Sequence, residues 1–266
     1  TDAEMERLIV KTRAPDYRAA AWKSLRDEKE EMLGRVWVET PDPAVNRLVN
    51  VWSKQQIQLC VEFGRDGARG FRDTLQDAWG ILPFNAPLAR AKIIETLAHQ
   101  WADGHAVRGW LPLQPHHYSD GPAWITPAVV AYLKETGDFG FLDEKVPFLD
   151  AGEDTVLGHM LRGVRHLASD LGSHGLVLAH EGDWNDSLNW MGKAGKGESV
   201  WTSMALFHSQ CLLAELAREI LHDADLAAEM LAGAETMREA VNRHGWDGEW
   251  YLAGWSDAGN PVGSHK

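Results

Sequence analysis

Residues 120–137 read Asp-Gly-Pro-Ala-Trp-Ile-Thr-Pro-Ala-Val-Val-Ala-Tyr-Leu-Lys-Glu-Thr-Gly, and this stretch carries the signals of one complete helix. Asp120 lies just ahead of Pro122. This order is common at a helix N-terminus, because an Asp side chain accepts from free backbone N–H groups and proline fits the first turn. Gly137 stands where such a helix ends. The pattern therefore predicts a helix over residues 122–136.

Similar apolar spacing predicts helices on both sides of this stretch. The Asp42-Pro43 pair begins a helix that runs to about residue 63. The other predicted helices cover residues 74–81, 86–101, 155–171, 199–221 and 225–243. Strand signals occur only near the end, where residues 249–255 and a turn at 256–260 predict one short β-hairpin. The predicted class is all-α.

Long loops separate several of these helices, at residues 64–70, 102–121 and 178–197. Loops of this length are more often functional than structural. Helices that alternate with loops of two lengths predict a ring of helical hairpins, because a four-helix bundle has fewer helices and a solenoid has a sequence period that we do not find. One end of such a ring gathers the long loops.

The first 35 residues differ from the rest of the chain. Residues 3–34 predict a charged helix that is interrupted at residues 14–16 by Pro15. This composition suits a linker or an outer helix. We therefore predict a helical linker over residues 1–35 and an α/α-barrel domain over residues 36–266.

Composition excludes several classes of function. The net charge of −13 and the absence of a dense Lys/Arg run argue against a nucleic-acid partner. No secretory signal or membrane span is expected, and the two cysteines, Cys60 and Cys211, give no disulfide framework, so we predict a cytoplasmic location. The 13 Trp residues are unusual, and we expect most of them to pack in the core.

The loop that begins at Gly182 is the richest in chemical groups. Asp183 and Asp186 flank Trp184 and Asn185. A protonated carboxylic acid can supply the proton that a leaving sugar oxygen needs, and a neighbouring indole shields such an acid from water. The alternative is a simple Asx turn with one capping aspartate. The Gly/Lys run at 192–197 lacks the Ser/Thr and the preceding strand of a nucleotide-binding loop.

Two other clusters precede that loop. Residues 64–77 place three arginines and three further aspartates among glycines, and these groups can hold sugar hydroxyls or phosphate, or form a solvated ion-pair network. Residues 103–124 contain His105, His116 and His117. Their spacing is a poor zinc template, so we predict no metal and expect polar lining of a sugar pocket.

Three motifs, in this order, resemble those of glycoside hydrolase family 94. They are residues 70–77 (Gly-Phe-Arg-Asp-Thr-Leu-Gln-Asp), residues 120–124 leading into 132–138, and residues 182–186 (Gly-Asp-Trp-Asn-Asp). The family contains cellobiose, cellodextrin and chitobiose phosphorylases, and the resemblance covers residues 36–266. It implies an (α/α)6 barrel after a β-sandwich domain, inverting cleavage of a β-glycoside, and inorganic phosphate as the nucleophile.

The resemblance also implies roles for single residues. By position, Asp186 is the general acid, and Trp184 and Asp73 line the subsite of the transferred sugar. The predicted substrate contacts are Arg72, Asp73, Asp120, Trp124, Asp183, Trp184, Asn185 and Glu198, and the predicted phosphate contact is Arg65. One acid suffices, because phosphate is already anionic, whereas an inverting hydrolase needs a second carboxylate as base for water.

We therefore predict an inverting glycoside phosphorylase, a hexosyltransferase that cleaves a β-linked gluco-disaccharide or oligosaccharide and yields an α-sugar 1-phosphate, without a metal or organic cofactor. One alternative is an inverting hydrolase on the same barrel, with Asp73, Asp183 or Glu198 as base. Another is a non-catalytic carbohydrate-binding domain. Gly67 and Gly121 depart from the family's motifs, and we expect an incomplete barrel and, in the full-length protein, a homodimer.

Overall fold

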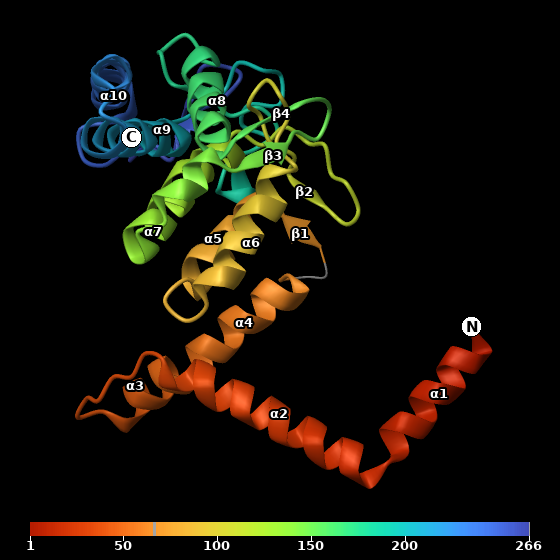
Figure 1. Ribbon diagram of the computed structural model, residues 1–266. Coiled ribbons are helices and arrows are strands. Elements are labelled where there is room, and N and C mark those ends of the chain that lie inside the picture. The colour runs from red at the N-terminus through yellow and green to blue at the C-terminus, as the bar shows by residue number, and fades with distance from the viewer. Residues whose placement is uncertain (66–67, 266) are drawn as a thin grey trace.

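The computed structural model describes residues 1–65 and 68–265, and its architecture is helical (Figure 1). The α-helices are α1 (Asp2–Arg13), α2 (Pro15–Gly34), α3 (Pro43–Arg47), α4 (Ser53–Phe63), α5 (Phe71–Ile81), α6 (Ala86–Leu97), α7 (Ile125–Thr136), α8 (Val156–Ser169), α9 (Val200–Leu216) and α10 (Ala224–Ala240). A π-helical turn joins α3 to α4, and similar turns extend α9 to Leu221 and α10 to Gly245. The predicted all-α class and (α/α)6-barrel fold are confirmed.

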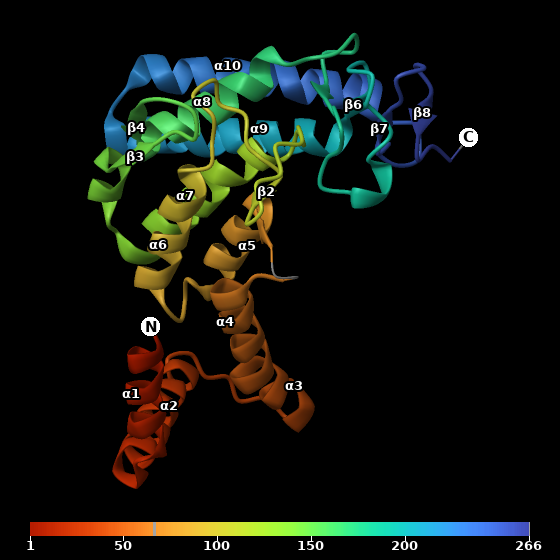
Figure 2. The same ribbon diagram turned by 90° about the vertical axis from the view of Figure 1, so that its right-hand side faces the viewer.

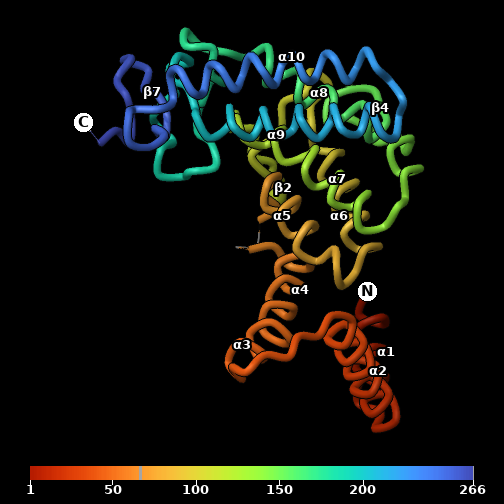
Figure 3. Tube along the Cα trace, turned by 90° about the vertical axis from the view of Figure 1, so that its left-hand side faces the viewer, coloured from red at the N-terminus to blue at the C-terminus, as the bar shows by residue number. Residues whose placement is uncertain are grey.

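Helical hairpins build the body of the molecule. The helices α5 and α6 pack side by side, as do α9 and α10, and α7 lies between these two pairs (Figures 2 and 3). Short connections at 82–85 and 222–223 close the two hairpins, whereas long loops precede α7 and α9. The loops that carry β6, β7 and β8 gather at one end of α9 and α10 (Figure 2). This end holds the candidate site described below.

The core lies between the facing sides of α5 to α10. On α5 the buried apolar residues Leu75, Ala78 and Ile81 recur at three-residue spacing, which places them on one face of the helix. They join one continuous apolar cluster with buried residues of the later helices, such as Val129 and Leu213. Burial of this apolar surface is the main force that holds the hairpins together.

Short antiparallel strands connect the loops. They are β1 (Arg69–Gly70), β2 (Gly109–Trp110), β3 (Lys145–Pro147), β4 (Glu153–Thr155), β5 (Val177–Leu178), β6 (Glu198–Ser199), β7 (Gly254–Trp255) and β8 (Pro261–Val262). The predicted C-terminal hairpin exists as β7–β8, but its strands cover 254–255 and 261–262 rather than 249–255. It also extends a four-stranded sheet of order β5-β6-β7-β8. Local patterns could not reveal this sheet, because its strands are two residues long and distant in sequence.

Residues 120–137 form a helix that begins differently from the prediction. A 3-10 turn over Gly121–Trp124 precedes α7, which ends at Gly137 in the left-handed conformation with φ of 68°. The Asp120 side chain makes no cap hydrogen bond, contrary to our expectation. Its carboxylate contacts Arg72 and Trp124 instead. The prediction for α6 was also too long, because this helix ends at Leu97 rather than near residue 101.

The N-terminal helices project away from the body (Figure 1). The predicted break is confirmed, since α1 ends at Arg13 and α2 begins at Pro15. In these two helices Met32 is the buried residue. The division into a linker and a barrel domain remains a prediction. None of the helices in the described ranges combines the length and apolar composition that a membrane span requires.

The expectation that most tryptophans pack in the core is wrong. Among the described residues, Trp110 belongs to the buried core, whereas the exposed large apolar side chains include Trp22, Trp37, Trp52, Trp79, Trp184, Trp190, Trp246 and Trp250. Most of the 13 tryptophans therefore do not pack the core. The apolar side of α3 and α4 is exposed as well, at Val45, Leu48, Leu59 and Phe63. The helix α4 nonetheless packs against α5, and its Val61 belongs to the buried core.

Candidate active site

The loop that carries Asp186 is fixed against the 102–121 loop. The backbone of Tyr118 forms isolated β-bridges with His180 and with Gly182. The Ser119 N–H donates to the Gly182 carbonyl at 2.9 Å. A Cβ atom at Gly182 would lie 2.7 Å from Cε1 of Tyr118, so only glycine fits under this ring without displacement. The close approach of the Tyr118 ring thus explains why the motif has glycine at position 182.

Asp183 holds the loop to the start of α9. Its side chain is buried, its Oδ1 accepts from the Asn185 N–H at 2.7 Å, and its Oδ2 accepts from the Ser199 hydroxyl at 2.5 Å. Ser199 is itself the N-cap of α9 and accepts from the Thr202 N–H at 3.0 Å. Both carboxylate oxygens are therefore occupied. Asp183 acts in this structure as a positioning residue.

Arg72, in the first turn of α5, connects the separate motifs. Its Nη1 donates to the Asp183 carbonyl at 2.8 Å and to Oδ2 of Asp120 at 3.2 Å. Its Nη2 donates to Oδ1 of Asp186 at 2.6 Å. The guanidinium has five N–H donors in a planar fork, which suits it to hold several oxygens at once. Three motifs that lie far apart in sequence thus converge on one side chain.

Asp120 is a buried carboxylate beside Arg72. Besides Arg72, it accepts from the indole Nε1 of Trp124 at 3.2 Å. Burial raises the pKa of Asp120 to about 6, although Arg72 and Trp124 act in the opposite direction. The prediction that Asp120 and Trp124 belong to one site is consistent with this contact. Their role as substrate contacts remains a prediction.

Asp186 lies at the open side of this network. Its side chain is 62% exposed, whereas that of Arg72 is 16% exposed. Asn185 caps the 3-10 turn Asp186–Leu188, because its side-chain oxygen accepts from the Ser187 N–H at 3.1 Å. Asn185 therefore supports the backbone that carries Asp186. Arg72 holds the Asp186 carboxylate on one side, and the exposed side can meet a ligand.

A cavity of about 350 Å³ opens at this point. Its lining residues are Arg65, Ala68, Arg69, Gly70, Phe71, Arg72, Asp73, Val107, Arg108, Gly109, Gln114, Tyr118, Asp120, Gly121 and Asp186. Four arginines and three aspartates therefore meet in one cavity, in a chain with a formal net charge of −13. Such a lining suits a polar ligand with an anionic part, because arginine binds oxyanions and aspartate accepts from hydroxyl groups.

Arg65 reaches the cavity but is engaged by carboxylates. It forms ion pairs with Asp73 at 3.0 Å and with the buried Asp77 at 2.8 Å. Burial raises the pKa of Asp77, although Arg65 opposes this. The predicted ion-pair network at residues 64–77 thus exists, at the wall of the cavity rather than in open solvent. The departure at Gly67 lies outside the described residues.

Three tryptophans form a row beside the network. Trp184 stacks on Trp201 with ring centroids 5.8 Å apart, and Trp124 contacts the same Trp201 ring at 5.6 Å. Trp184 is 47% exposed. It is not part of the cavity lining described above. Its predicted contact with the transferred sugar stays a prediction.

Glu198 is not brought to this cavity. It is fully buried on β6, where its carboxylate accepts from the His174 N–H at 2.9 Å and contacts the His174 ring Nδ1 at 2.5 Å. It does not line the cavity. Both of its oxygens are bound and shielded in this structure, and its predicted contact with the substrate stays a prediction.

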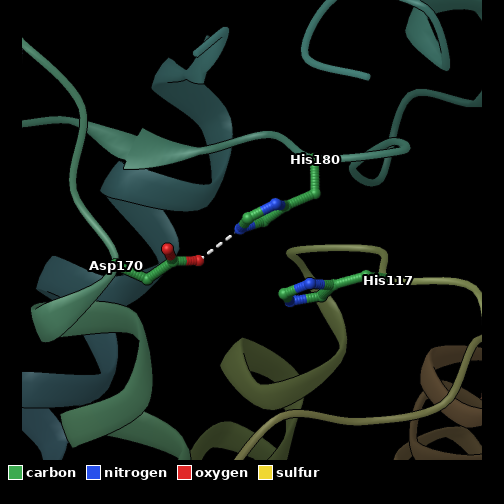
Figure 4. Close-up of side chains that lie close together, drawn as sticks. All are labelled: His117, Asp170 and His180. Carbon is green, nitrogen blue, oxygen red and sulfur yellow. Dashed lines mark hydrogen bonds and ion pairs between the residues drawn. The ribbon is translucent and has the colours of Figure 1, made fainter. Parts of the chain in front are cut away.

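The predicted site residues do not include several residues that line the cavity, and some of these carry polar groups that can meet a ligand. Arg108 and Tyr118 line the cavity, with the guanidinium 5.0 Å from the phenol ring centroid. Arg108 reaches it because β2 pairs with β1, a pairing of two-residue strands that no local pattern signals. The three histidines predicted to line the pocket do not. His105 and His117 lie in a separate cluster, part of which is shown in Figure 4.

Helical hairpins with long loops at one end, around a cavity of arginines and aspartates, define a domain of the (α/α)6-barrel class. Within that class, the chain belongs to the glycosyl hydrolase 94 superfamily, whose catalytic-domain model matches residues 29–266.

The relatives include several phosphorylases. The solabiose phosphorylase of Paenibacillus borealis is 56% identical over 258 residues, which are 97% of this chain and 34% of that protein. The 3-O-beta-D-glucopyranosyl-beta-D-glucuronide phosphorylase of the same organism is 33% identical, over 92% of this chain and 33% of that protein. The N,N'-diacetylchitobiose phosphorylase of Vibrio furnissii is 29% identical, over 93% of this chain and 35% of that protein. The chain thus spans about a third of the length of these curated relatives.

Proposed function

We propose that the protein is an inverting glycoside phosphorylase, which cleaves a β-linked disaccharide or oligosaccharide with phosphate and releases an α-sugar 1-phosphate. The observation that carries the proposal is the ion pair between Arg72 and Asp186 at the mouth of the arginine-lined cavity. It places one accessible carboxylate beside groups that bind an oxyanion. The relatives named above, which are phosphorylases by name, support the same conclusion.

The state of the other carboxylates favours phosphorolysis over hydrolysis. An inverting hydrolase needs a free carboxylate as base for water. The three residues considered for that role are all engaged: Asp183 and Glu198 are buried and hydrogen-bonded, and Asp73 is paired with Arg65. Phosphate needs no such base, because it is already a nucleophilic anion. One accessible acid is therefore enough.

The reaction assigns distinct tasks to the residues of the site. Asp186 protonates the leaving sugar oxygen, and phosphate attacks the anomeric carbon from the opposite face. The ion pair with Arg72 is a contact of the ionised carboxylate that remains after Asp186 has donated its proton. Arg72 also binds Asp120 and the Asp183 carbonyl. No metal or organic cofactor enters this chemistry.

The choice of substrate follows from the relatives. The 56% identity to a solabiose phosphorylase makes solabiose the first sugar to test, followed by other β-linked gluco-disaccharides. The product should be the α-anomer of a sugar 1-phosphate. We also propose that the protein works in the cytoplasm and that the natural full-length protein forms a homodimer.

The assay compares disaccharide cleavage by the natural full-length protein with and without inorganic phosphate. We expect sugar 1-phosphate to form only when phosphate is present, and NMR of this product identifies its anomer, which cannot mutarotate while the phosphate is attached. Cleavage at equal rate without phosphate would establish the hydrolase instead. Binding without any cleavage would establish a carbohydrate-binding domain.

The Asp186→Asn variant tests the acid. We expect kcat to fall by at least about 100-fold, because general acid catalysis contributes about 10² to 10⁴. A substrate with a nitrophenolate leaving group needs no protonation, so the variant should lose far less activity on it. Asp143→Asn, at an exposed aspartate that ends the 3-10 helix Phe139–Asp143, is the matched control and should keep its activity. Equal loss on both substrates would contradict the assignment of Asp186 as the acid.

A further inference from the structure

A cluster of histidines and aspartates lies beside the candidate site and has no part in the proposed reaction. His117 and His180 stack with ring centroids 3.9 Å apart and an interplanar angle of 15°. The Nε2 atom of His180 contacts Oδ2 of Asp170 at 2.5 Å (Figure 4). His105 and His166 are both in ring contact with His117, at 5.2 and 5.8 Å. Four imidazoles and a carboxylate thus occupy one small volume.

The donor atoms are spaced for one metal ion. One ligand atom from each of His117, Asp170 and His180 lies within 4.8 Å of the others. In a tetrahedral site with bonds of about 2.0–2.2 Å the ligand atoms lie about 3.3–3.6 Å apart, so movements of up to about 1.5 Å close the set. The side chains converge from three separate elements, as Figure 4 shows. Two imidazoles and one carboxylate are a common donor set for divalent zinc and its neighbours.

The cluster also contains an unused donor. The Nε2 atom of His166 is buried and has no hydrogen-bond partner within the described residues. Such orphaned polar atoms are rare in folded proteins and need an explanation. A metal ion, or a water molecule bound to one, would satisfy this nitrogen. His166 also lines a surface depression of about 740 Å³, which gives an ion a route toward the cluster.

The His180 backbone has a φ of 51°, a left-handed value that is uncommon for residues other than glycine and that marks a constrained position.

We propose that His117, Asp170 and His180 bind one divalent transition-metal ion, with Zn²⁺ as the probe ion. The ion replaces the proton shared between His180 and Asp170, so binding releases this proton. It has a structural task, because it joins the 102–121 loop, the end of α8 and the segment that leads to Asp183. His180 precedes Asp186 by a few residues, so the ion braces the loop that carries the proposed acid. This inference does not depend on the proposed function.

The direct test measures metal content and affinity. The natural full-length protein, prepared without a polyhistidine tag, is stripped with a chelator, dialysed and titrated with Zn²⁺ by calorimetry. We expect one ion per chain, and a rise in Tm when Zn²⁺ is added, because a ligand of the native state stabilises it. The absence of stoichiometric binding would overturn the proposal.

Variants locate the ion. His117→Gln, His180→Gln and Asp170→Asn should each weaken Zn²⁺ binding by at least about 10-fold, since even residues that only support a metal ligand change affinity by about 10- to 100-fold. His116→Gln is the matched control, because His116 neighbours His117 in sequence but contacts Glu181 at 2.7 Å instead. Unchanged affinity in His117→Gln and His180→Gln would contradict the assigned site.

A second measurement avoids the variants, some of which could fold poorly. Co²⁺ added to the stripped wild-type protein should give visible absorption bands of a four- or five-coordinate ion with nitrogen ligands, and Zn²⁺ should displace them. The bands of six-coordinate, hydrated Co²⁺ alone would overturn the proposal, whatever the variants do.

Discussion

Asp120 links the candidate site to the stability of the fold. Its carboxyl group is almost completely buried, and it meets Arg72 and Trp124 at the base of the cavity. Burial favours the protonated form, and the pKa of Asp120 is raised to about 6 for this reason, although Arg72 opposes the change. A raised pKa links the stability of the fold to pH.

This linkage predicts a pH dependence with a definite sign. Below about pH 4 the Asp120 carboxyl group is protonated in both the folded and the unfolded chain. As the pH rises toward 6, the unfolded chain releases this proton first, so the free energy of unfolding falls. The full loss, reached above the folded pKa of about 6, is up to roughly 3 kcal/mol, from about 1.36 kcal/mol per pKa unit.

The measurement compares urea unfolding of the wild type and Asp120→Asn between pH 4 and pH 7. The difference in unfolding free energy between the two proteins isolates Asp120 from the other titrating groups. We expect the wild type to lose stability relative to the variant as the pH rises. A difference that is flat over this range, or that changes in the opposite sense, would contradict the raised pKa.

At the scale of elements, the glycine- and lysine-rich run at 192–197 has a defined structural role. Its backbone N–H groups point at one carboxylate: Asp257 accepts from Ala194 at 2.7 Å and from Lys196 and Gly197 at 2.9 Å each. Although burial opposes it, donation by these N–H groups holds the pKa of Asp257 below its usual value. Like a phosphate-binding loop, the run binds an anion through its backbone N–H groups, but this anion is the Asp257 carboxylate of the same chain.

We predict that Asp257→Ala frees this part of the loop. Trypsin cleavage after Lys193 or Lys196 should become about 10-fold faster or more, because a hydrogen bond to a charged group contributes about 1.5–3 kcal/mol. Limited proteolysis followed by mass spectrometry identifies the cut. Asp143→Ala is the control, and its cleavage pattern should match the wild type. If Asp257→Ala were cleaved at the wild-type rate, the carboxylate would not be what anchors the loop.

At the scale of the whole molecule, α1 and most of α2 contribute little to the packed body. No residue of α1 is buried. The contacts of α2 with the body are concentrated near its end, where Lys29 donates to Gln58 at 2.5 Å and Met32 is buried. The fully buried Lys54 donates to the carbonyl of Leu33 at 2.6 Å and to that of Val36.

Two deletions should therefore differ sharply. Removal of residues 1–28 should change Tm by less than about 2 °C, because surface changes rarely exceed about 0.5 kcal/mol. Removal of residues 1–36 also deletes both carbonyl partners of Lys54, together with the buried Met32. Its Tm should fall by at least about 5 °C, since breaking a buried charged contact costs about 3–5 kcal/mol. Calorimetry of both proteins checks this, and equal Tm values would contradict it.

The helices, most of their limits and the loop that carries Asp186 could be predicted from the sequence. Apolar spacing and end signals are local properties, so α5, α8 and α10 could be predicted from their own residues. The ordered motifs indicated Arg72, Asp120 and Asp186. The break between α1 and α2 follows from Pro15 alone, since proline cannot continue a helix.

The tertiary structure alone decided which of these residues meet. Arg72 joins Asp120 and Asp186 across intervals of 48 and 114 residues, β2 brings Arg108 to the cavity, and Glu198 is turned to His174 instead. The same holds for His117, Asp170 and His180, whose spacing in the chain gave no metal-binding pattern. Contacts of this kind depend on how the hairpins pack and where the long loops return, and no local pattern of residues carries that information.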